Sequence, residues 1–362
     1  MNKDVFEDLF ILEMTNNHKG DVKRGLEIIR QFSSVARFNN VRTAIKLQFR
    51  DVDSFVHKDF RSRTDIYYVK RVLETRLTLE EYAMLVEAIK KSNCIPMTTP
   101  FDEKSVDLIE YFDMPIIKIA SSGCNDWMLV ERIAKTRKPV VVSIGGMSLK
   151  DMDDMVTFFE NRNIPLCLLH CIAAYPTEDR DLQLNQIDFL KQRYPNHTIG
   201  LSSHEFHDWH SSVTAAYAKG ARVFERHMDI NSDGSKIAAY SSLPHQVDEW
   251  YKAWQHAKLI CGASGQSRIM PIERETDYLN SYIRGVYAKR DLREGDILTD
   301  QDIYLAIPLQ KGQLSCRELM LGRWGHHIVK PLSADQPIMI DSIDTPYAAD
   351  ERLRQIIDNR GI

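Results

Sequence analysis

Two histidines occupy equivalent positions at the ends of consecutive apolar runs. His204 closes the run HTIGLSSH (197–204), and His227 closes the run ARVFERH (221–227). Neighbouring parallel strands lie roughly 5 Å apart, so imidazoles at their ends can meet at one ion. Two histidine ligands leave coordination positions open for substrate and water, as Lewis-acid catalysis requires. Imidazole suits Mn²⁺, Fe²⁺ and Zn²⁺ alike, and the alternative for each histidine is a hydrogen-bonded core or loop residue.

Lysines and hydroxyl groups end other apolar runs of the chain. Lys46 and Lys118 end the second and fourth runs, where a lysine is costly to desolvate unless it meets a negative partner. The hydroxyls at the ends of further runs belong to Thr99, Ser121, Ser143 and Ser202. Together these groups suit a small, doubly charged anion, because each can donate to phosphate or carboxylate oxygens. Taken one at a time, the hydroxyls could simply cap the helices that follow.

A carboxylate stands at the end of the first run. Glu13 precedes Asn16, Asn17 and His18. Beside a metal, such a carboxylate can move a proton or orient a sugar hydroxyl. It can equally form a structural ion pair with Lys46, and the sequence leaves both interpretations open.

The apolar runs that carry these residues are spaced as the strands of one barrel would be. They cover residues 10–18, 41–48, 94–101, 116–122, 139–146, 165–171, 197–204 and 221–227. Between most of them lie stretches of helical period, such as 78–92, where Thr78 and Glu81 predict a capping box, and 208–219, which Gly220 would end. Eight strand-then-helix units close a (β/α)8, or TIM, barrel, whose chemistry sits at the C-terminal ends of the strands. The fold therefore predicts that these polar residues meet at one mouth.

The connection between the second and third runs is longer than a barrel unit needs. It covers residues 49–76. Long loops at this end of a barrel usually carry substrate contacts or form lids. A partly helical insertion with no function is the alternative, and the sequence does not separate the two.

A second module follows the barrel, which needs roughly 250 residues. We assign residues 1–262 to the barrel, 263–282 to a polar, irregular linker, 283–345 to a small α+β domain and 346–362 to a helical tail. Short β runs alternate with tight turns in the small domain. Two of its stretches, LREGDILT and LSADQPIMI, resemble each other in outline.

The composition argues against several classes of function. The chain has 362 residues, 43% of them hydrophobic, and a formal net charge of -4, so nothing suggests a nucleic-acid or membrane partner. No run approaches the ~20 apolar residues of a membrane span, and the acidic N-terminus does not resemble a secretory signal. The 6 cysteines show no paired spacing, which predicts free, buried thiols in a reducing cytoplasm.

Short motifs run in register along nearly the whole chain. They are EMTNNHKG (13–20), IKLQ (45–48), TPF (99–101), KIAS (118–121), SIGGMS (143–148), HC and YPT (170–171 and 175–177), GLSSH (200–204) and ERH (225–227). In this order they resemble the sialic acid synthase family, that is, N-acetylneuraminate synthase and its relatives. The stretch 283–345 looks like the antifreeze-like domain of that family.

The resemblance implies a transferase that condenses phosphoenolpyruvate with a sugar aldehyde, N-acetylmannosamine or a related acceptor. The products would be a 2-keto-3-deoxy nonulosonic acid of the sialic type and phosphate. It implies a divalent metal, most commonly Mn²⁺, on His204 and His227, with Glu13 and Lys118 as further catalytic residues. The matching substrate-binding residues are Lys46, Gln48, Thr99, Ser121, Ser143, Tyr175 and Ser202. It also implies a homodimer in which the small domain of one subunit covers the partner's barrel mouth.

Several positions depart from the family pattern. Gly123 replaces a glutamate, Ala173 replaces an asparagine, and Lys236 lies where an aspartate is expected. Ile307 stands in place of an arginine that reaches the neighbouring subunit's sugar. Each lost polar contact to the sugar would cost about 1–3 kcal/mol of binding. We therefore expect a divergent relative with a different acceptor. Lys236 hints at an acidic or phosphorylated one, although a solvent-facing lysine is the alternative.

Two other functions remain open from the residues. One is a non-catalytic or regulatory barrel that binds a phosphorylated metabolite. Gly123 and Ala173 favour it, whereas the two histidines and Glu13 argue against it. The other is an aldolase in which Lys118 forms a Schiff base, which would leave the histidine pair idle.

Overall fold

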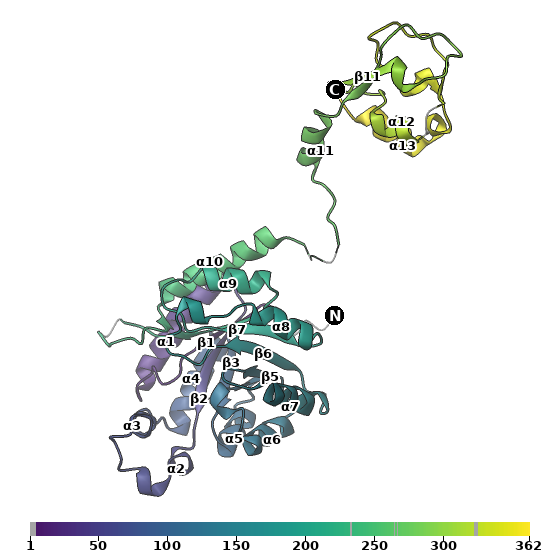
Figure 1. Cartoon of the computed structure of the whole chain (residues 1–362). Coiled ribbons are helices and arrows are strands. Elements are labelled where there is room, and N and C mark those ends of the chain that lie inside the picture. The colour runs from purple at the N-terminus through teal and green to yellow at the C-terminus, as the bar shows by residue number, and fades with distance from the viewer. Residues whose placement is uncertain (1–4, 232–233, 264, 266, 322–324) are drawn as a thin grey trace. The chain divides into compact units, whose positions relative to one another are not determined.

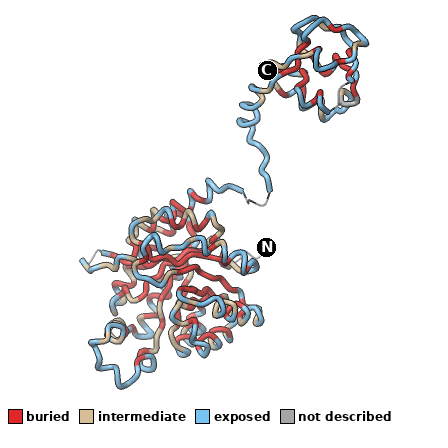
Figure 2. Tube along the Cα trace, in the orientation of Figure 1, coloured by how far each residue is buried: buried red, intermediate tan, exposed pale blue. Residues whose placement is uncertain are grey.

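The chain divides into two compact units, each with its own hydrophobic core. The computed structural model describes residues 5–231, 234–263, 265, 267–321 and 325–362. The first unit spans Met1–Gly262 and the second Ala263–Ile362 (Figure 1). In the first unit, buried residues concentrate along the strands (Figure 2). No helix among the described residues is long and apolar enough to cross a membrane.

Parallel strands β1 to β8 form a closed barrel in the first unit. Each strand pairs with the next one in the sequence, and β8 pairs with β1, which closes the sheet. The strands are β1 (Leu9–Glu13), β2 (Thr43–Phe49), β3 (Ile95–Pro100), β4 (Ile116–Ile119), β5 (Val140–Ser143), β6 (Leu166–Cys171), β7 (Thr198–Ser202) and β8 (Val223–Met228). The short strand β9 (Ser241–Ser242) pairs with the end of β8. The predicted (β/α)8 barrel is confirmed, and each predicted run supplies one strand.

Helices cover the outside of the barrel (Figure 1). They are α1 (Val22–Phe38), α4 (Leu79–Lys91), α5 (Glu103–Tyr111), α6 (Trp127–Lys135), α7 (Leu149–Glu160), α8 (Gln186–Arg193), α9 (Ser211–Ala218) and α10 (Pro244–Cys261). The predicted capping box begins α4, because Thr78 Oγ1 accepts from Glu81 N while Glu81 Oε2 accepts from Thr78 N. After α9, Gly220 has a φ of 98°, which a glycine adopts without steric cost.

The barrel interior has an apolar floor beneath its polar mouth. Side chains alternate between the two faces of each strand. One buried cluster contains Leu9, Ile11, Ala44, Met97, Ile116, Val141, Cys167, Leu169 and Val223. Their neighbours Phe10 and Leu12 belong instead to the larger core between strands and helices. Cys167 therefore fills the core. The cysteines are free thiols as predicted, but Cys261 and Cys316 are exposed rather than buried.

The long connection between β2 and β3 is partly helical. It contains α2 (Val52–Phe55), the 3-10 turn η1 (Lys58–Phe60) and α3 (Tyr67–Glu74). Val52, Val56 and Val72 form a small hydrophobic cluster of their own, which holds α2 and α3 together. We call residues 49–76 the insertion. The remaining 3-10 turns of the barrel are η2 (Ser121–Gly123) and η3 (Asp179–Asp181).

The second unit contains short antiparallel strand pairs. Its elements are α11 (Glu273–Asn280), β10 (Gly285–Ala288), η4 (Asp300–Asp302), β11 (Ile303–Ala306), α12 (Cys316–Leu321), β12 (His327–Ile328), η5 (Ile340–Ser342), β13 (Ile343–Asp344), η6 (Pro346–Ala349) and α13 (Glu351–Asn359). The two similar stretches of sequence pair with each other through Leu292 and Leu332. The stretch expected to be irregular contains α11, and Ile357 of α13 is buried in the core of this unit. Residues 322–324 of this unit lie outside the described ranges.

Candidate active site

A pocket opens where the strands of the barrel end. It is lined by Glu13, Lys46, Gln48, Thr99, Lys118, Ala120, Ser121, Ser143, Cys171, Tyr175, Ser202, His204, Glu225 and His227. Every residue that the sequence predicted for the site is in this set, so the structure brings them together at one mouth. Ala120, Cys171 and Glu225 are the lining residues that the prediction omitted.

Strand periodicity explains why these side chains converge. In β1, Leu9 and Ile11 belong to the apolar floor, and Glu13 is the next residue on the same face. In β8, Val223 belongs to the floor, and Glu225 and His227 follow at the same spacing of two. The polar residues therefore form a layer directly above the apolar one.

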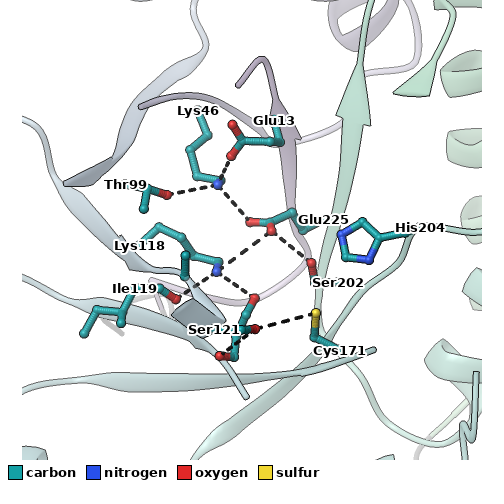
Figure 3. Close-up of polar contacts among 12 residues, drawn as sticks. Glu13, Lys46, Thr99, Lys118, Ile119, Ser121, Cys171, Ser202, His204 and Glu225 are labelled. Atoms are coloured by element: carbon teal, nitrogen blue, oxygen red, sulfur yellow. Dashed lines mark hydrogen bonds and ion pairs between the residues drawn. The ribbon is translucent and has the colours of Figure 1, made fainter. Parts of the chain in front are cut away.

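Lys46 is held between two carboxylates and a hydroxyl. It forms ion pairs with Glu13 and, at 3.7 Å, with Glu225 Oε2. Its Nζ also donates to Thr99 Oγ1 at 3.1 Å (Figure 3). Burial lowers the pKa of Lys46 to about 7, although Glu225 opposes the shift. Of the two interpretations open for Glu13, the structure contains the ion pair with Lys46.

Lys118 has a comparable environment on the other side of Glu225 (Figure 3). Its Nζ donates to Ser143 Oγ at 2.6 Å and to the carbonyl oxygen of Ile119 at 3.0 Å. It lies 3.9 Å from Glu225 Oε1. Ser121 completes this side, donating to the carbonyl oxygen of Ser143 at 3.3 Å. Both lysines are thus fixed with their ammonium groups at the pocket.

Glu225 is the charged residue that sequence analysis missed. Its Oε1 accepts from Ser202 Oγ at 2.9 Å, while its buried Oε2 accepts no hydrogen bond from the described residues. Burial alone would raise the pKa of this carboxyl, but Lys118 and Lys46 outweigh it and lower the pKa below its ordinary value. Glu225 is therefore ionised at neutral pH. A usable signal was present, because a glutamate two residues before His227 shares its face of the strand.

The two histidines lie together at the same mouth. Their ring centroids are 5.2 Å apart with planes inclined at 56°. His204 Nδ1 lies 3.1 Å from the carbonyl oxygen of Ile172, and His227 Nδ1 is buried without a hydrogen-bond partner among the described residues. Burial lowers the pKa of His204 to about 4 and that of His227 well below 6.5. Both imidazoles are therefore neutral at physiological pH, with lone pairs available to a ligand.

These features fit a metal ion. A metal requires neutral imidazoles, and a ligating histidine usually donates its other ring N–H to a carbonyl or carboxylate, as His204 can to Ile172. The unpartnered nitrogen of His227 supplies a second donor. No cluster of three or more His, Cys, Asp and Glu suited to a metal occurs in the described ranges. An ion on this pair would therefore take its remaining ligands from water and substrate.

Aromatic rings border the histidine side of the pocket. The Tyr175 ring centroid lies 4.2 Å from that of His204, and the Tyr240 ring centroid lies 5.0 Å from that of His227. The two tyrosine rings are 5.3 Å apart. Tyr240 was not predicted from the sequence, because it comes from the connection after β8 rather than from a strand end. Each of the two tyrosine rings therefore lies close to both imidazoles.

The residues at the positions that depart from the family pattern are exposed or have open space around them. Ala173 and Lys236 are exposed, as the alternative interpretation of Lys236 expected. At Gly123, an added Cβ would meet only Ile119 Cγ2, at 3.8 Å. Ile307 is exposed in the second unit. Of the positions in the barrel, Gly123, Ala173 and Lys236 are not among the residues that line the pocket.

The chain matches one family model and several known proteins in sequence. Residues 39–266 match the model of the NeuB family. An uncharacterized protein of Methanocaldococcus jannaschii is 30% identical over 81% of this chain and 82% of its own length. A pseudaminic acid synthase of Campylobacter jejuni is 26% identical over 83% of this chain and 87% of its own.

Two solved structures are similar to this chain in both fold and sequence. A putative spore coat polysaccharide biosynthesis protein E of Chromobacterium violaceum is 39% identical, with a TM-score of 0.88, and the match covers 94% of this chain and 100% of that one. An N-acetylneuraminic acid synthetase of Leptospira borgpetersenii, in complex with citrate, is 26% identical with a TM-score of 0.66. That match covers 78% of this chain and 93% of the other.

Proposed function

This chain belongs to the NeuB family, and we propose that it condenses phosphoenolpyruvate with a sugar aldehyde to give a 2-keto-3-deoxy nonulosonic acid and phosphate. Relatives named as pseudaminic acid synthase and N-acetylneuraminic acid synthetase support this reaction class. The observation that carries the proposal is one pocket that holds two buried lysines, two carboxylates and two neutral imidazoles.

The lysine side of the pocket binds phosphoenolpyruvate in this proposal. Lys46 and Lys118 meet its phosphate and carboxylate, and the hydroxyls of Thr99, Ser143 and Ser202 donate to the remaining oxygens. In the free protein the lysine charges are balanced by Glu13 and Glu225. An incoming anion favours the protonated form of Lys46, whose pKa of about 7 would otherwise leave it partly neutral.

The histidine side binds the acceptor. His204 and His227 would hold a divalent metal, Mn²⁺ being the ion we expect, and this metal would polarise the aldehyde oxygen when bound. The carbonyl oxygen of Ile172 fixes the tautomer of His204 and the direction of its ring. Tyr175 and Tyr240 keep this side of the pocket dry.

The atoms of the reaction balance without an oxidant or reductant. C3 of phosphoenolpyruvate forms a bond to the aldehyde carbon, and the aldehyde oxygen takes up a proton to become a hydroxyl. Over the whole reaction the water supplies this proton and also the one that the released phosphate carries. Water adds at C2, and the bond between C2 and the phosphate oxygen breaks. Glu225 is ionised and its Oε2 accepts no hydrogen bond from the described residues, so it can accept the proton that this water loses.

Phosphate release tests the proposal. We expect the full-length protein with Mn²⁺ to release phosphate from phosphoenolpyruvate only when a suitable aldose is present, across a panel of 2-acetamido sugars and their phosphates. In water enriched in ¹⁸O, the released phosphate should carry no label, because the bond to C2 breaks. Labelled phosphate, or release that needs no sugar, would identify a hydrolase instead. Lys118→Ala is the matched inactive control, since it removes one phosphate contact.

A non-catalytic barrel that binds a phosphorylated metabolite is the second candidate. Gly123 and Ala173, where relatives carry polar residues, are the positions that favour it. It predicts that phosphoenolpyruvate binds but no aldose in a broad panel elicits phosphate release. Binding without turnover would thus replace the synthase proposal by this one.

A further inference from the structure

Two half-buried arginines lie beside the pocket and have no role in the reaction described above. Arg50 directly follows β2, and Arg71 lies in α3 of the insertion. Among the described residues, Arg50 contacts Gln48 and aromatic rings, and Arg71 contacts tyrosine hydroxyls. Neither arginine forms an ion pair with a carboxylate within the described part of the chain.

Arg50 adjoins the pocket through Gln48. Its Nη2 donates to Gln48 Oε1 at 2.8 Å, and Gln48 Nε2 in turn donates to Glu13 Oε1 at 3.2 Å. The guanidinium lies 3.7 Å from the centroid of the Phe101 ring, which leaves little water around it. Its Nε is buried with no hydrogen-bond partner in the described ranges. Burial lowers the pKa of Arg50 to about 10, so this cation is held at a cost.

Asp102 lies near Arg50, but its carboxylate accepts hydrogen bonds from other groups. The charge of Asp102 acts on Arg50 without forming an ion pair with it. Asp102 instead caps α5, accepting from Ser105 N at 2.8 Å, and accepts from Asp51 N at 2.8 Å. Asp102 therefore does not occupy the free donor of Arg50.

Arg71 adjoins the histidine side of the same pocket. Its Nη1 donates to the Tyr67 hydroxyl at 3.1 Å. Burial opposes its charge, but Tyr67 and Tyr240 outweigh it and raise the pKa of Arg71. The charge of Arg71 also contributes to the low pKa of His227 and acts on Arg50. Arg71 thus lies close to both the histidine pair and the other arginine.

Three exposed basic residues of the insertion form ion pairs with carboxylates. Arg63 pairs with Asp65 at 2.6 Å, Lys70 with Glu74 at 3.8 Å, and Arg76 with Asp53 at 2.7 Å. These pairs are solvent-exposed, where an ion pair contributes little. Lys58 and Arg61 have no ion pair among the described residues either, but both are exposed to water. Arg50 and Arg71 differ because they are half-buried, where an unpaired cation is costly. Such an arrangement is typical of a site whose negative partner is a ligand.

We propose that Arg50 and Arg71 bind an anionic group on the acceptor sugar, so that this protein uses a phosphorylated or carboxylated aldehyde. The inference rests on the function proposed above and specifies its acceptor class. Guanidinium groups suit both anions, because their paired N–H donors match phosphate and carboxylate oxygens. Arg71 lies on the histidine side and Arg50 adjoins the pocket through Gln48, whereas Lys46 and Lys118 bind phosphoenolpyruvate in the proposed reaction. Exposed Lys236, which the sequence suggested for this role, lies outside the pocket lining.

Steady-state kinetics of the full-length protein with Mn²⁺ tests the inference. Three acceptors are compared: N-acetylmannosamine, its 6-phosphate and the corresponding uronic acid. We expect kcat/KM at least about tenfold higher for one anionic acceptor than for the neutral sugar, and the two anionic arms separate phosphate from carboxylate. In Arg71→Gln and Arg50→Gln, the KM for that acceptor should rise about tenfold or more while the KM for phosphoenolpyruvate changes less than about twofold. Arg71→Lys should recover part of the loss.

Arg63→Gln is the matched control, because it removes an exposed, ion-paired arginine from the same insertion. Equal use of neutral and anionic acceptors by the wild-type protein would overturn the inference. So would an Arg71→Gln variant whose KM for phosphoenolpyruvate rises as much as that for the acceptor. Calorimetric binding of the three sugars covers the case without turnover: an anionic sugar that binds no better than the neutral one contradicts the inference, whereas absent phosphate release contradicts only the synthase reaction.

Discussion

Glu13, Lys46, Lys118 and Glu225 place two carboxylates and two ammonium groups inside the barrel, each at most 5% exposed. Buried charges are tolerated when each meets an opposite charge and its hydrogen bonds are satisfied. Here the charges alternate through ion pairs from Glu13 to Lys118. Besides the carboxylates, the lysines contact the hydroxyls of Thr99 and Ser143 and the carbonyl oxygen of Ile119. This arrangement suits the anionic substrate that we propose, because an incoming anion can pair with the same ammonium groups.

Buried neutral histidines should make the protein sensitive to acid. Burial and Arg50 lower the pKa of His18 to about 4, and burial lowers that of His204 equally. Well above pH 6.5 both imidazoles are unprotonated in the folded and in the unfolded protein, so they do not make the free energy of unfolding depend on pH there. Between pH 6.5 and about 4 the unfolded chain binds protons that the native protein does not, so the free energy of unfolding falls with falling pH. Each histidine contributes at most about 1.4 kcal/mol per pH unit.

Denaturant unfolding of His18→Asn at pH 7.5 and pH 5 measures this effect, since His18 is outside the pocket lining. We expect a smaller loss of stability on acidification than in the wild type. His256→Asn, on the exposed side of α10, should leave the dependence unchanged. An identical pH dependence in all three proteins would contradict the assignment.

The residues of the pocket differ in how visible they are from sequence. Polar residues that end apolar runs, such as Lys118 and Ser143, were predicted because strand period and barrel topology determine where they point. Glu225 lies within β8 rather than at its end, so the rule that selects polar residues at the ends of apolar runs did not select it. Arg50 and Arg71 depend on how the insertion packs, which no local period encodes. The positions of Arg50 and Arg71 are determined by tertiary contacts, which a sequence pattern does not predict.

At the scale of elements, close approach of β7 to β8 depends on one glycine. A Cβ at Gly200 would lie 2.3 Å from the carbonyl oxygen of Val223 and 2.5 Å from Leu169 Cδ2. We expect Gly200→Ala to lower the free energy of unfolding by about 1–3 kcal/mol or more, because the strand backbone must move. Gly123→Ala is the control, since its Cβ meets only one atom at 3.8 Å. Equal unfolding midpoints for the two variants would show that the barrel absorbs the extra methyl group.

Element positions followed the sequence closely where both period and end signals were present. α4 spans Leu79–Lys91, within the stretch 78–92 that the helical period predicted, and its Thr78 and Glu81 form the predicted capping box. The insertion was less readable, because its apolar residues form only a small separate cluster. Likewise α11 has no buried residue among those described, so no amphipathic face marked it. The sequence does not predict the bounds of such elements, because they have no buried face that would give a hydrophobic period.

At the scale of the whole molecule, the C-terminal helix completes the second unit. Ile357 of α13 is buried in its core, and Arg360 donates to Glu318 at 2.8 and 3.1 Å in a buried pair. Removing one partner of such a pair leaves an uncompensated buried charge. The segment 346–362 therefore stabilises the unit that the sequence assigned to 283–345.

Limited trypsin digestion tests this organisation. In the full-length protein we expect cleavage at exposed sites such as Arg268 and Arg274, giving two resistant fragments. A chain that ends at residue 345 should lose the resistant C-terminal fragment while the barrel fragment persists. Persistence of both fragments after this truncation would mean that α13 is dispensable for the second unit.

The central claim is that the histidine pair and the lysine–carboxylate layer form one catalytic site. Its most direct test is Mn²⁺-dependent phosphate release from phosphoenolpyruvate, with the best acceptor of the panel, in His227→Asn and in the exposed control His256→Asn. We predict that His227→Asn loses about 100-fold or more in kcat with an unchanged unfolding midpoint, because a metal donor is gone, and that the control matches the wild type. Mn²⁺-dependent turnover in His227→Asn within about twofold of the wild type would contradict the account.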